Sequence, residues 1–233
     1  MTVTYIRHSA FLVETDSACL LFDWYEEAPL PPIPEGKPLY VLASHGHWDH
    51  FGEAIFDLLK DREKVTYLLS HDIQEDLPKN LPQANVHFLQ PHVLWKDDIL
   101  TVEPFRSTDL GIAFWCTLDG KRIYHAGDLN HWYWEGEEEG WNRDMTKSYR
   151  EEITRMAGRT ADLAFLPVDP RLGDWFYLGA DDFMKASDAR HLVPMHFWED
   201  YSVCRQLKNH PCSRDYRDRI LTIEKKGQRF TIE

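Results

Sequence analysis

The sequence lacks several features that would tie a protein to a membrane, to an oxidising compartment or to a cysteine metal site. None of its four cysteines forms a Cys-x-x-Cys pair, so no structural zinc knuckle is expected. No apolar run approaches the ~18 residues of a membrane helix, and no basic segment followed by an apolar stretch suggests a signal peptide. These absences predict a cytoplasmic protein with reduced thiols and no membrane partner.

Positive charge is also scarce. Lys and Arg together number 26 against 39 Asp and Glu, which gives a net charge of −13. Because an acidic surface repels phosphate backbones, we expect no nucleic-acid partner. The chain has 233 residues, 43% of them hydrophobic, and no linker or internal repeat divides it, so we predict a single domain over residues 1–233. The composition leaves the oligomeric state open.

Histidine, by contrast, is concentrated in one short stretch. Three imidazoles and a carboxylate fall within six positions of the segment Ser44-His45-Gly46-His47-Trp48-Asp49-His50-Phe51. An apolar run over 39–43 precedes this segment and predicts a buried strand, and an amphipathic segment over 53–60 follows it and predicts a helix. Open α/β sheets place their chemistry in such loops, at the carboxyl ends of strands.

This loop offers neutral imidazole and carboxylate, the ligand types that zinc, iron and manganese bind. Alternation along the loop can direct His45 and His47 toward one ion, while Asp49 and His50 turn toward a second. The alternative is a polar loop of solvated histidines, but so dense a cluster rarely falls in the right structural position by accident. A metal centre is therefore the prediction.

The pattern His-x-His-x-Asp-His after a strand resembles the metallo-β-lactamase superfamily of metallohydrolases. The resemblance implies an α/β (α+β) fold, a four-layer αββα sandwich. The order of elements agrees, because two strand-rich groups followed by helices interleaved with strands suit two packed mixed sheets with helices on both outer faces. Residues 5–13 and the later Pro-Met-His look most like the branch of L-ascorbate-6-phosphate lactonase-like proteins, whose substrate we do not transfer.

Hydrophobic patterns predict the remaining elements. Besides the strand before the histidines, strands are expected at 2–7, 10–15, 18–23, 65–70, 86–89, 99–105, 112–118, 122–125, 163–168, 191–195, 220–224 and 229–232. Besides the helix after the histidines, helices are expected at 72–79, 144–158, 181–187 and 201–209.

Two further ligands are expected at later strand ends. Gly127 allows a close approach of the backbone, and it precedes Asp128 in the segment Tyr124-His125-Ala126-Gly127-Asp128. His196 follows the strand that ends in a Pro-Met pair. The resemblance implies that Asp128 bridges two metals and that His196 is the last metal histidine. A turn aspartate and a helix-flanking histidine are the alternatives.

The resemblance is broken at one ligand. Family members usually carry a third histidine for the first metal before the strand that begins at 112, but here the segment reads Ser107-Thr108-Asp109-Leu110-Gly111. Asp109 is the obvious substitute, although it can equally be a turn aspartate. We expect one or two divalent ions, zinc first, with the oxygen ligand shifting preference toward manganese or iron. The expected metal ligands are His45, His47, Asp49, His50, Asp109, Asp128 and His196.

Other residues near this centre receive supporting or catalytic assignments. Asp23 ends a strand, and the resemblance implies that it supports the metal loop from behind, although a turn role is equally open. Asp49 is expected to orient the attacking water. His131 is a candidate acid for the leaving group, with a surface histidine as the alternative.

The stretch 129–142 is aromatic first and then acidic, and it is either a lid over the metals or a surface insertion. Trp132, Tyr133 and Trp134 can present an apolar wall, to which Trp48, Trp175 and Trp198 can add. The glutamates of this stretch would disfavour highly anionic substrates unless they face solvent; they are Glu135, Glu137, Glu138 and Glu139.

The function predicted from these features is hydrolysis by a metal-activated water, acting on an ester, lactone or phosphoester of a small molecule. A non-catalytic binding member is favoured by the missing histidine and opposed by the complete second half-site. A di-iron oxidoreductase would resemble His-x-Glu-x-Asp, from which His47 departs. A nuclease of the same fold is disfavoured by the net charge.

Overall fold

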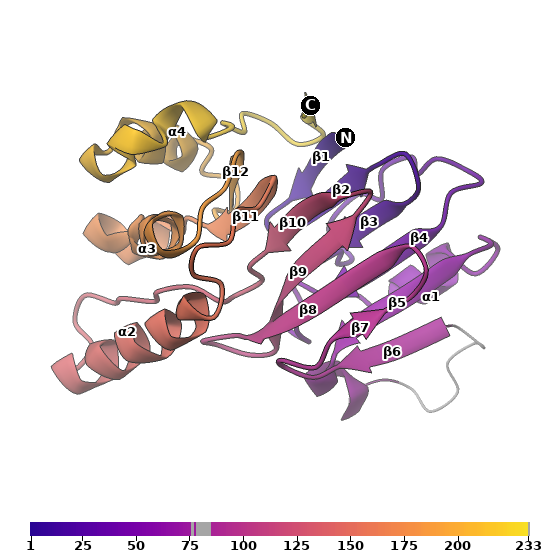
Figure 1. Ribbon diagram of the computed structural model, residues 1–233, viewed down its shortest axis with the longest axis horizontal. Coiled ribbons are helices and arrows are strands. Elements are labelled where there is room, and N and C mark those ends of the chain that lie inside the picture. The colour runs from indigo at the N-terminus through magenta and orange to yellow at the C-terminus, as the bar shows by residue number, and fades with distance from the viewer. Residues whose placement is uncertain (76, 78–84, 233) are drawn as a thin grey trace.

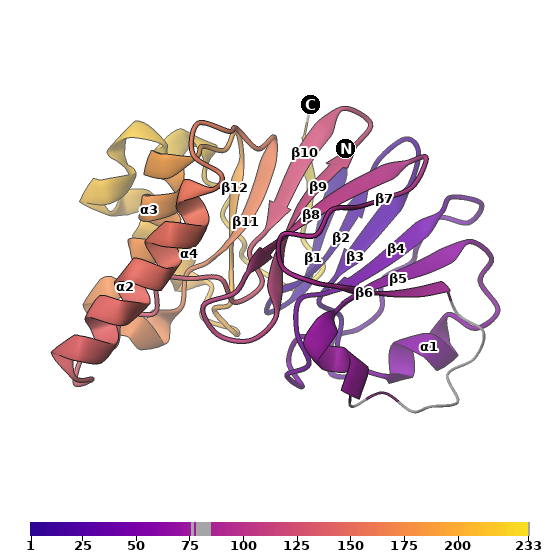
Figure 2. The same ribbon diagram turned by 60° about the horizontal axis from the view of Figure 1, so that its bottom comes forward.

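The computed structural model describes residues 1–75, 77 and 85–232. Its strands form two sheets that pack face to face, with helices on the two outer sides (Figure 1). Turning the molecule separates the layers: α1 lies beyond the first sheet, and α2, α3 and α4 lie beyond the second (Figure 2). The predicted αββα architecture is confirmed.

The first sheet has seven strands in the order β13-β1-β2-β3-β4-β5-β6. Neighbours from β13 to β3 run antiparallel, and those from β3 to β6 run parallel. The strands are β1 Thr2–Arg7, β2 Ala10–Glu14, β3 Cys19–Phe22, β4 Leu39–Ala43, β5 Val65–Ser70, β6 Asn85–Leu89 and β13 Arg229–Thr231.

The second sheet has six strands in the order β12-β11-β10-β9-β8-β7. It repeats the first sheet's plan, because β7 to β10 run antiparallel and β10 to β12 run parallel. The strands are β7 Trp95–Lys96, β8 Leu100–Arg106, β9 Ile112–Leu118, β10 Lys121–His125, β11 Leu163–Pro167 and β12 Leu192–Met195.

The helices are short apart from α2. Among the described residues, none combines the length and the apolar character needed to cross a membrane. The α-helices are α1 Ala54–Leu58, α2 Glu139–Thr154, α3 Leu178–Ala186 and α4 Ser202–Asn209, and the 3₁₀ turns are η1 His71–Glu75, η2 Pro170–Trp175, η3 Pro211–Asp215 and η4 Arg217–Arg219.

Three predicted elements differ most from the structure. Residues 220–224 form only an isolated bridge at Ile220, because the side chain of Gln228 bonds the backbone of Glu224 and Thr222 in place of a strand ladder. The helix predicted at 144–158 begins at Glu139 and ends at Thr154. The helix predicted at 72–79 is a 3₁₀ turn over 71–75, and residues 76, 78 and 79 lie outside the described residues.

Aromatic side chains fill the space between the sheets. The ring of Phe165, on β11, lies 4.3 Å from that of Phe11, on β2, and 6.0 Å from that of Phe22, on β3. All three side chains are fully buried. Because aromatic burial dominates core energetics, these contacts between sheets fix the relative position of the strand ends on either side.

Replacement of Phe165 by alanine is therefore expected to lower the free energy of unfolding by about 3–5 kcal/mol, since the cavity would open between both sheets. Urea denaturation followed by tryptophan fluorescence measures this. Leu94→Ala is the control, because Leu94 is 55% exposed and should cost less than about 0.5 kcal/mol. Equal effects of the two changes would contradict the assigned core.

Candidate metal centre

The polar side chains of the candidate site follow the carboxyl ends of six strands. His8 follows β1, Asp23 follows β3, and the segment 44–50 follows β4. From the second sheet come residues that follow β10, β11 and β12, namely Asp128, Asp169 and His196. Packing of the two sheets brings these strand ends to one edge of the sandwich, so residues far apart in the sequence meet there.

Two glycines allow the loops to approach this closely. A Cβ atom on Gly127 would lie 2.6 Å from the Cβ of Ser44 and 2.9 Å from the carbonyl oxygen of Ile112. One on Gly111 would lie 2.0 Å from the carbonyl oxygen of Ser44. Both glycines have positive φ angles, +51° and +74°, which other residues rarely adopt. The close approach predicted at Gly127 is thus present, and Gly111 adds a second one.

The carboxylate of Asp128 lies at the middle of the site. Its Oδ1 is 3.3 Å from Nε2 of His50 and 3.3 Å from Nε2 of His196. Its Oδ2 faces the other way and is 3.8 Å from Nε2 of His45. The two oxygens therefore point to different sets of imidazoles, which is the arrangement that a bridging carboxylate requires.

Three buried atoms of this set have no hydrogen-bond partner among the described residues: Nε2 of His45, Nε2 of His50 and Oδ1 of Asp128. Buried polar atoms are almost always satisfied, because leaving one unpaired costs about 1–3 kcal/mol. Converging imidazole nitrogens and a carboxylate are the donors that zinc and related divalent ions bind. These residues therefore fit a metal ion.

Further side chains orient two of these histidines. Nδ1 of His50 donates to Oδ2 of Asp23 over 2.8 Å, and Asp23 also accepts from the backbone N–H and the hydroxyl of Ser44. Nδ1 of His196 donates to Oδ2 of Asp169 over 2.9 Å. A carboxylate behind a metal-binding histidine fixes its tautomer and ring orientation. Asp23 thus occupies the supporting position expected of it.

The charges of the site control one another's protonation. Burial opposes charge on Asp128, but His196 and His50 outweigh this and hold the pKa of Asp128 well below its usual value. Burial, with some repulsion from His50, lowers the pKa of His45 to about 3. Burial also opposes charge on His196, yet Asp128 and Asp169 raise its pKa to about 10. These shifts favour an ionised Asp128 and a neutral His45, which are the forms that bind metal.

The side of the site near Asp109 is more open. His47, Asp109 and Asp128 each offer one ligand atom within 4.8 Å of the others. Nδ1 of His47 lies 3.9 Å from Oδ2 of Asp109, and both side chains are about half exposed. Burial and the neighbouring Asp128 raise the pKa of Asp109. Asp109 can therefore offer an oxygen ligand beside His47 and Asp128, and its substitution for the missing histidine stays a prediction.

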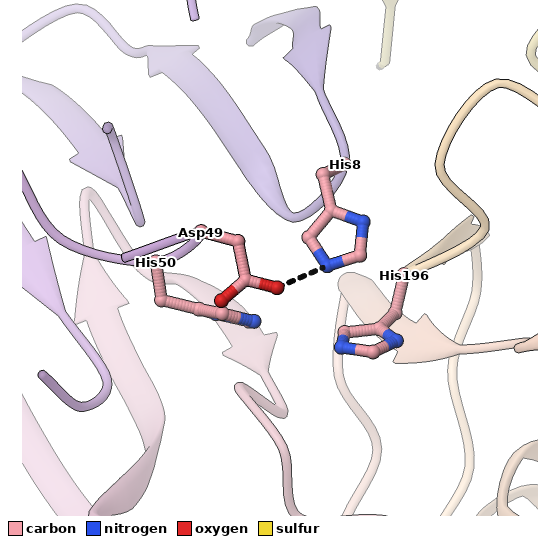
Figure 3. A group of neighbouring side chains, drawn as sticks. All are labelled: His8, Asp49, His50 and His196. Atoms are coloured by element: carbon pink, nitrogen blue, oxygen red, sulfur yellow. Dashed lines mark ion pairs between the residues drawn. The ribbon is translucent and has the colours of Figure 1, made fainter. Parts of the chain in front are cut away.

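A residue that the sequence analysis left without a role completes the other side. His8 joins Asp49, His50 and His196 in a group whose ligand atoms lie within 4.8 Å of one another (Figure 3). Its Nε2 is 3.5 Å from Oδ2 of Asp49, and its ring, fully buried, lies 4.2 Å from those of His196 and Trp198. His8 has a φ of +51°, a strained backbone conformation of the kind found at functional sites.

Asp169 was also missed, although one signal could have found it. Like the histidine cluster, it directly follows a buried strand that is parallel to its neighbours. The rule that sites lie at the carboxyl ends of such strands applies to it as well as to the other ligands. His8 follows a strand with antiparallel neighbours, so the same rule gives no signal for it.

His131 does not line the cavity beside the metal ligands. Its Nδ1 lies 3.0 Å from Oδ2 of Asp182, and its Nε2 lies 2.7 Å from the hydroxyl of Thr146. Because both ring nitrogens already have partners, neither is available to protonate a leaving group. The placement of His131 thus gives no support to its assignment as an acid, and points instead to a structural link between the 129–142 stretch, α2 and α3.

Most of the aromatic residues predicted for the apolar wall line the cavity, but Tyr133 and Trp175 do not. Trp132 and Trp134 line the cavity, as do Trp48 and Trp198. Trp175 does not; its ring packs 4.7 Å from that of Tyr133. The glutamates of the stretch are exposed and do not line the cavity, so they do not exclude anions from it; they are Glu135, Glu137, Glu138 and Glu139.

Comparison with known proteins agrees with this geometry. Residues 2–139 match the family described as Beta-lactamase superfamily domain. The chain belongs to this family. It is 27% identical over 249 residues to a UPF0173 metal-dependent hydrolase of Korarchaeum cryptofilum, covering 99% of both chains. It is 29% identical over 218 residues to one of Methanobrevibacter smithii, covering 84% of this chain and 82% of the other.

Solved structures show the same fold. The metallo hydrolase Igni18 of Ignicoccus hospitalis superimposes with a TM-score of 0.66 at 19% identity, over 100% of this chain and 99% of the other. The di-iron β-hydroxylase CmlA of Streptomyces venezuelae gives a TM-score of 0.55 at 12% identity, over 84% and 44%. The predictions of the superfamily, and of a metal-dependent hydrolase as the enzyme class, are confirmed. The lactonase-like branch stays a prediction.

Replacement of Asp23 by asparagine is expected to weaken metal binding about 10- to 100-fold. Because one oxygen accepts from the Ser44 N–H, the new amide nitrogen would face Nδ1 of His50, and two donors would meet. Competition with a chelator of known affinity measures the change. Asp97→Asn is the control, since Asp97 also accepts backbone N–H groups but belongs to none of the ligand groups; an equal loss there would argue against the role of Asp23.

Proposed function

We propose that the protein hydrolyses an ester, lactone or phosphoester bond of a small molecule at a centre that holds one or two divalent ions. The observation that carries this proposal is the set of buried, unpartnered atoms of His45, His50 and Asp128, which face one another. The adjoining cavity has a volume of about 560 Å³, the size of a site for a small molecule.

The residues divide into two half-sites that share Asp128. His45, His47 and Asp109 would hold a first ion with Asp128, and Asp49, His50 and His196 would hold a second with it. Zinc suits the imidazoles, and the oxygen of Asp109 shifts the preference of the first half-site toward manganese or iron.

When bound, the ions lower the pKa of a water molecule and polarise the bond to be cleaved. Asp49 lines the cavity, where its carboxylate would accept a hydrogen bond from the attacking water and orient it. Nε2 of His8 lies 3.5 Å from Oδ2 of Asp49, and we expect its buried ring to restrict the movement of this carboxylate. The tryptophans around the cavity would lower the local dielectric, which strengthens the electrostatic interactions inside.

The alternatives from the sequence make different predictions. A non-catalytic member would hold metal without turnover. The di-iron alternative predicts bound iron and a visible absorbance band, and the likeness to CmlA, at 12% identity, extends only to the fold. Composition still argues against nucleic-acid partners.

A His45→Ala, His47→Ala double variant tests the centre. Purified wild-type protein is expected to carry one to two equivalents of divalent metal and to hydrolyse some members of a panel of simple esters, lactones and phosphodiesters. The double variant should lose much of the metal and at least ~100-fold in kcat/KM. Elemental analysis and initial rates are the measurements. His87→Ala serves as the control, because His87 belongs to none of the ligand groups; unchanged metal content in the double variant would refute the site.

A His8→Asn variant tests the role of the residue behind Asp49. Asparagine tolerates positive φ, so the turn should persist while the ring facing Asp49 is lost. Nε2 of His8 lies 3.5 Å from Oδ2 of Asp49 without a hydrogen bond between them, so the loss of the ring would leave the Asp49 carboxylate freer to move. Because a small misplacement of a positioning group costs up to about 100-fold, kcat is expected to fall about 10- to 100-fold with metal content unchanged. A loss of metal instead would identify His8 as a ligand, and an unchanged kcat would leave it no part in the reaction.

A further inference from the structure

The cavity beside the metal ligands combines a large apolar wall with a single arginine. Five indole rings line it, more than any other kind of side chain, and Met145 adds to them; the five are Trp48, Trp132, Trp134, Trp141 and Trp198. Ligand sites are usually apolar with a few placed polar groups. The wall therefore favours substrates with an apolar body, and the polar groups determine how the substrate is oriented.

Two tryptophans of the wall, Trp132 and Trp134, are held in place by specific contacts. The indole N–H of Trp132 donates to the backbone carbonyl of Asp128 over 3.0 Å. The ring of Trp132 is nearly parallel to that of Trp134, with centroids 6.3 Å apart. Asn142 bonds both the N–H and the carbonyl of Trp134, at 3.0 and 2.9 Å. A wall fixed in this way can stack a planar or extended apolar group without first being ordered.

Arg171 is the only lysine or arginine among the described residues that line this cavity. Its Nε donates to both carboxylate oxygens of Asp169, over 3.0 and 2.9 Å, and its Nη2 donates to Oδ2. No hydrogen bond joins Nη1 to any described residue. Its Cζ lies 5.8 Å from the centre of the Trp134 ring. One edge of the guanidinium is thus fixed, and further N–H donors stay available beside the wall.

The other charges of the cavity leave room for an anion at this position. The lining carboxylates, those of Asp49, Asp109 and Asp128, are the ones that would face the divalent ions. The glutamates of the 129–142 stretch are exposed outside the cavity. A guanidinium held by one carboxylate and unopposed on its other edge is suited to bind a carboxylate or phosphate group.

We propose that Arg171 and the tryptophan wall together select substrates that carry one anionic group on an apolar or aromatic body. The inference rests on the proposed function, because the bond to be cleaved would lie at the metals while the anionic group lies on Arg171. Asp169 joins the two positions, since it accepts from Arg171 and from His196. The arrangement therefore fixes the anion relative to the reacting end of the substrate.

Calorimetric titration of the metal-loaded protein with three probes tests this selection. The probes share one phenyl-bearing chain and differ in the end group: 4-phenylbutyrate, 4-phenylbutyl phosphate and neutral 4-phenylbutanamide. Arg171→Gln should weaken both anionic probes about 10- to 100-fold, since charge-assisted hydrogen bonds are lost, and change the amide less than about twofold. Trp134→Ser should weaken all three by a similar factor. If the affinity for one anionic probe falls more than that for the other in Arg171→Gln, its end group, carboxylate or phosphate, is the one that Arg171 recognises.

Arg150→Gln is the matched control, because Arg150 pairs with Asp182 and does not line the cavity. It should leave the affinity for all three probes unchanged. Metal content and circular dichroism of each variant exclude general damage. Arg171→Lys keeps the charge but loses the paired donors, so its affinity for the anionic probes should lie between those of wild type and Arg171→Gln. It replaces the glutamine variant if that variant does not fold.

Several outcomes would overturn the proposal. Anionic probes that bind wild type and Arg171→Gln equally would show that the metals alone hold the anion. An equal loss for the amide would give Arg171 a structural role only. The apolar subsite would be refuted if the wild-type protein bound none of the probes. It would also be refuted if Trp134→Ser bound all three probes with the affinity of the wild type. Failure to hold metal or to hydrolyse the substrate panel would refute the proposed function instead, and these are separate measurements.

Discussion

The structure depends on one constraint: three imidazoles and a carboxylate are buried together at the joint between two sheets. Asp128 lies within 3.8 Å of His45, His50 and His196. Buried ionisable groups are tolerated when they are paired or bind a metal. Here the outward nitrogens of His50 and His196 are paired with carboxylates, and that of His45 with the hydroxyl of Ser44. The inward atoms of His45, His50 and Asp128 are left facing one another.

That constraint explains the backbone around the site. Three of its residues, His8, Asp23 and His196, have positive φ angles without being glycine. Such conformations cost of order 1–3 kcal/mol each and persist only where the surroundings enforce them. The enforcing contacts are the sheet core beneath, with Phe165 at its middle, and the hydrogen bonds of Asp23 and Asp169 above. The packing of the two sheets therefore offsets the strain of these loop residues and keeps the loops in a fixed geometry.

The sequence predicted well what is local. The strand before His45 and the loop that follows could be identified because hydrophobic run, ligands and helix lie within about twenty residues. The fold class followed from element order and from the resemblance. Boundaries such as the start of α2 at Glu139 were harder, because the side chain of Asn142 and the tryptophans before it determine them through tertiary contacts.

Site residues that come together only through the pairing of strands distant in the sequence could not be predicted. His8 and Arg171 carry no motif; they matter only because β1 and β11 end beside the histidine loop. The same holds in reverse for His131, whose proximity to Asp128 in the sequence suggested a catalytic role. Its backbone turns the ring toward α2, where Thr146 and Asp182 occupy both nitrogens. Nearness along the chain is a poor guide to nearness at a site.

The shared use of Asp169 has a consequence for how such an enzyme can diversify. One carboxylate orients a metal-binding histidine and anchors the cationic side chain of the cavity. A change at Asp169 would therefore alter the metal-binding histidine and the position of Arg171 together, whereas changes among the tryptophans leave that carboxylate alone. New substrate specificities should therefore arise first through substitutions in the apolar wall. The position of the Arg171 guanidinium should change most slowly during evolution.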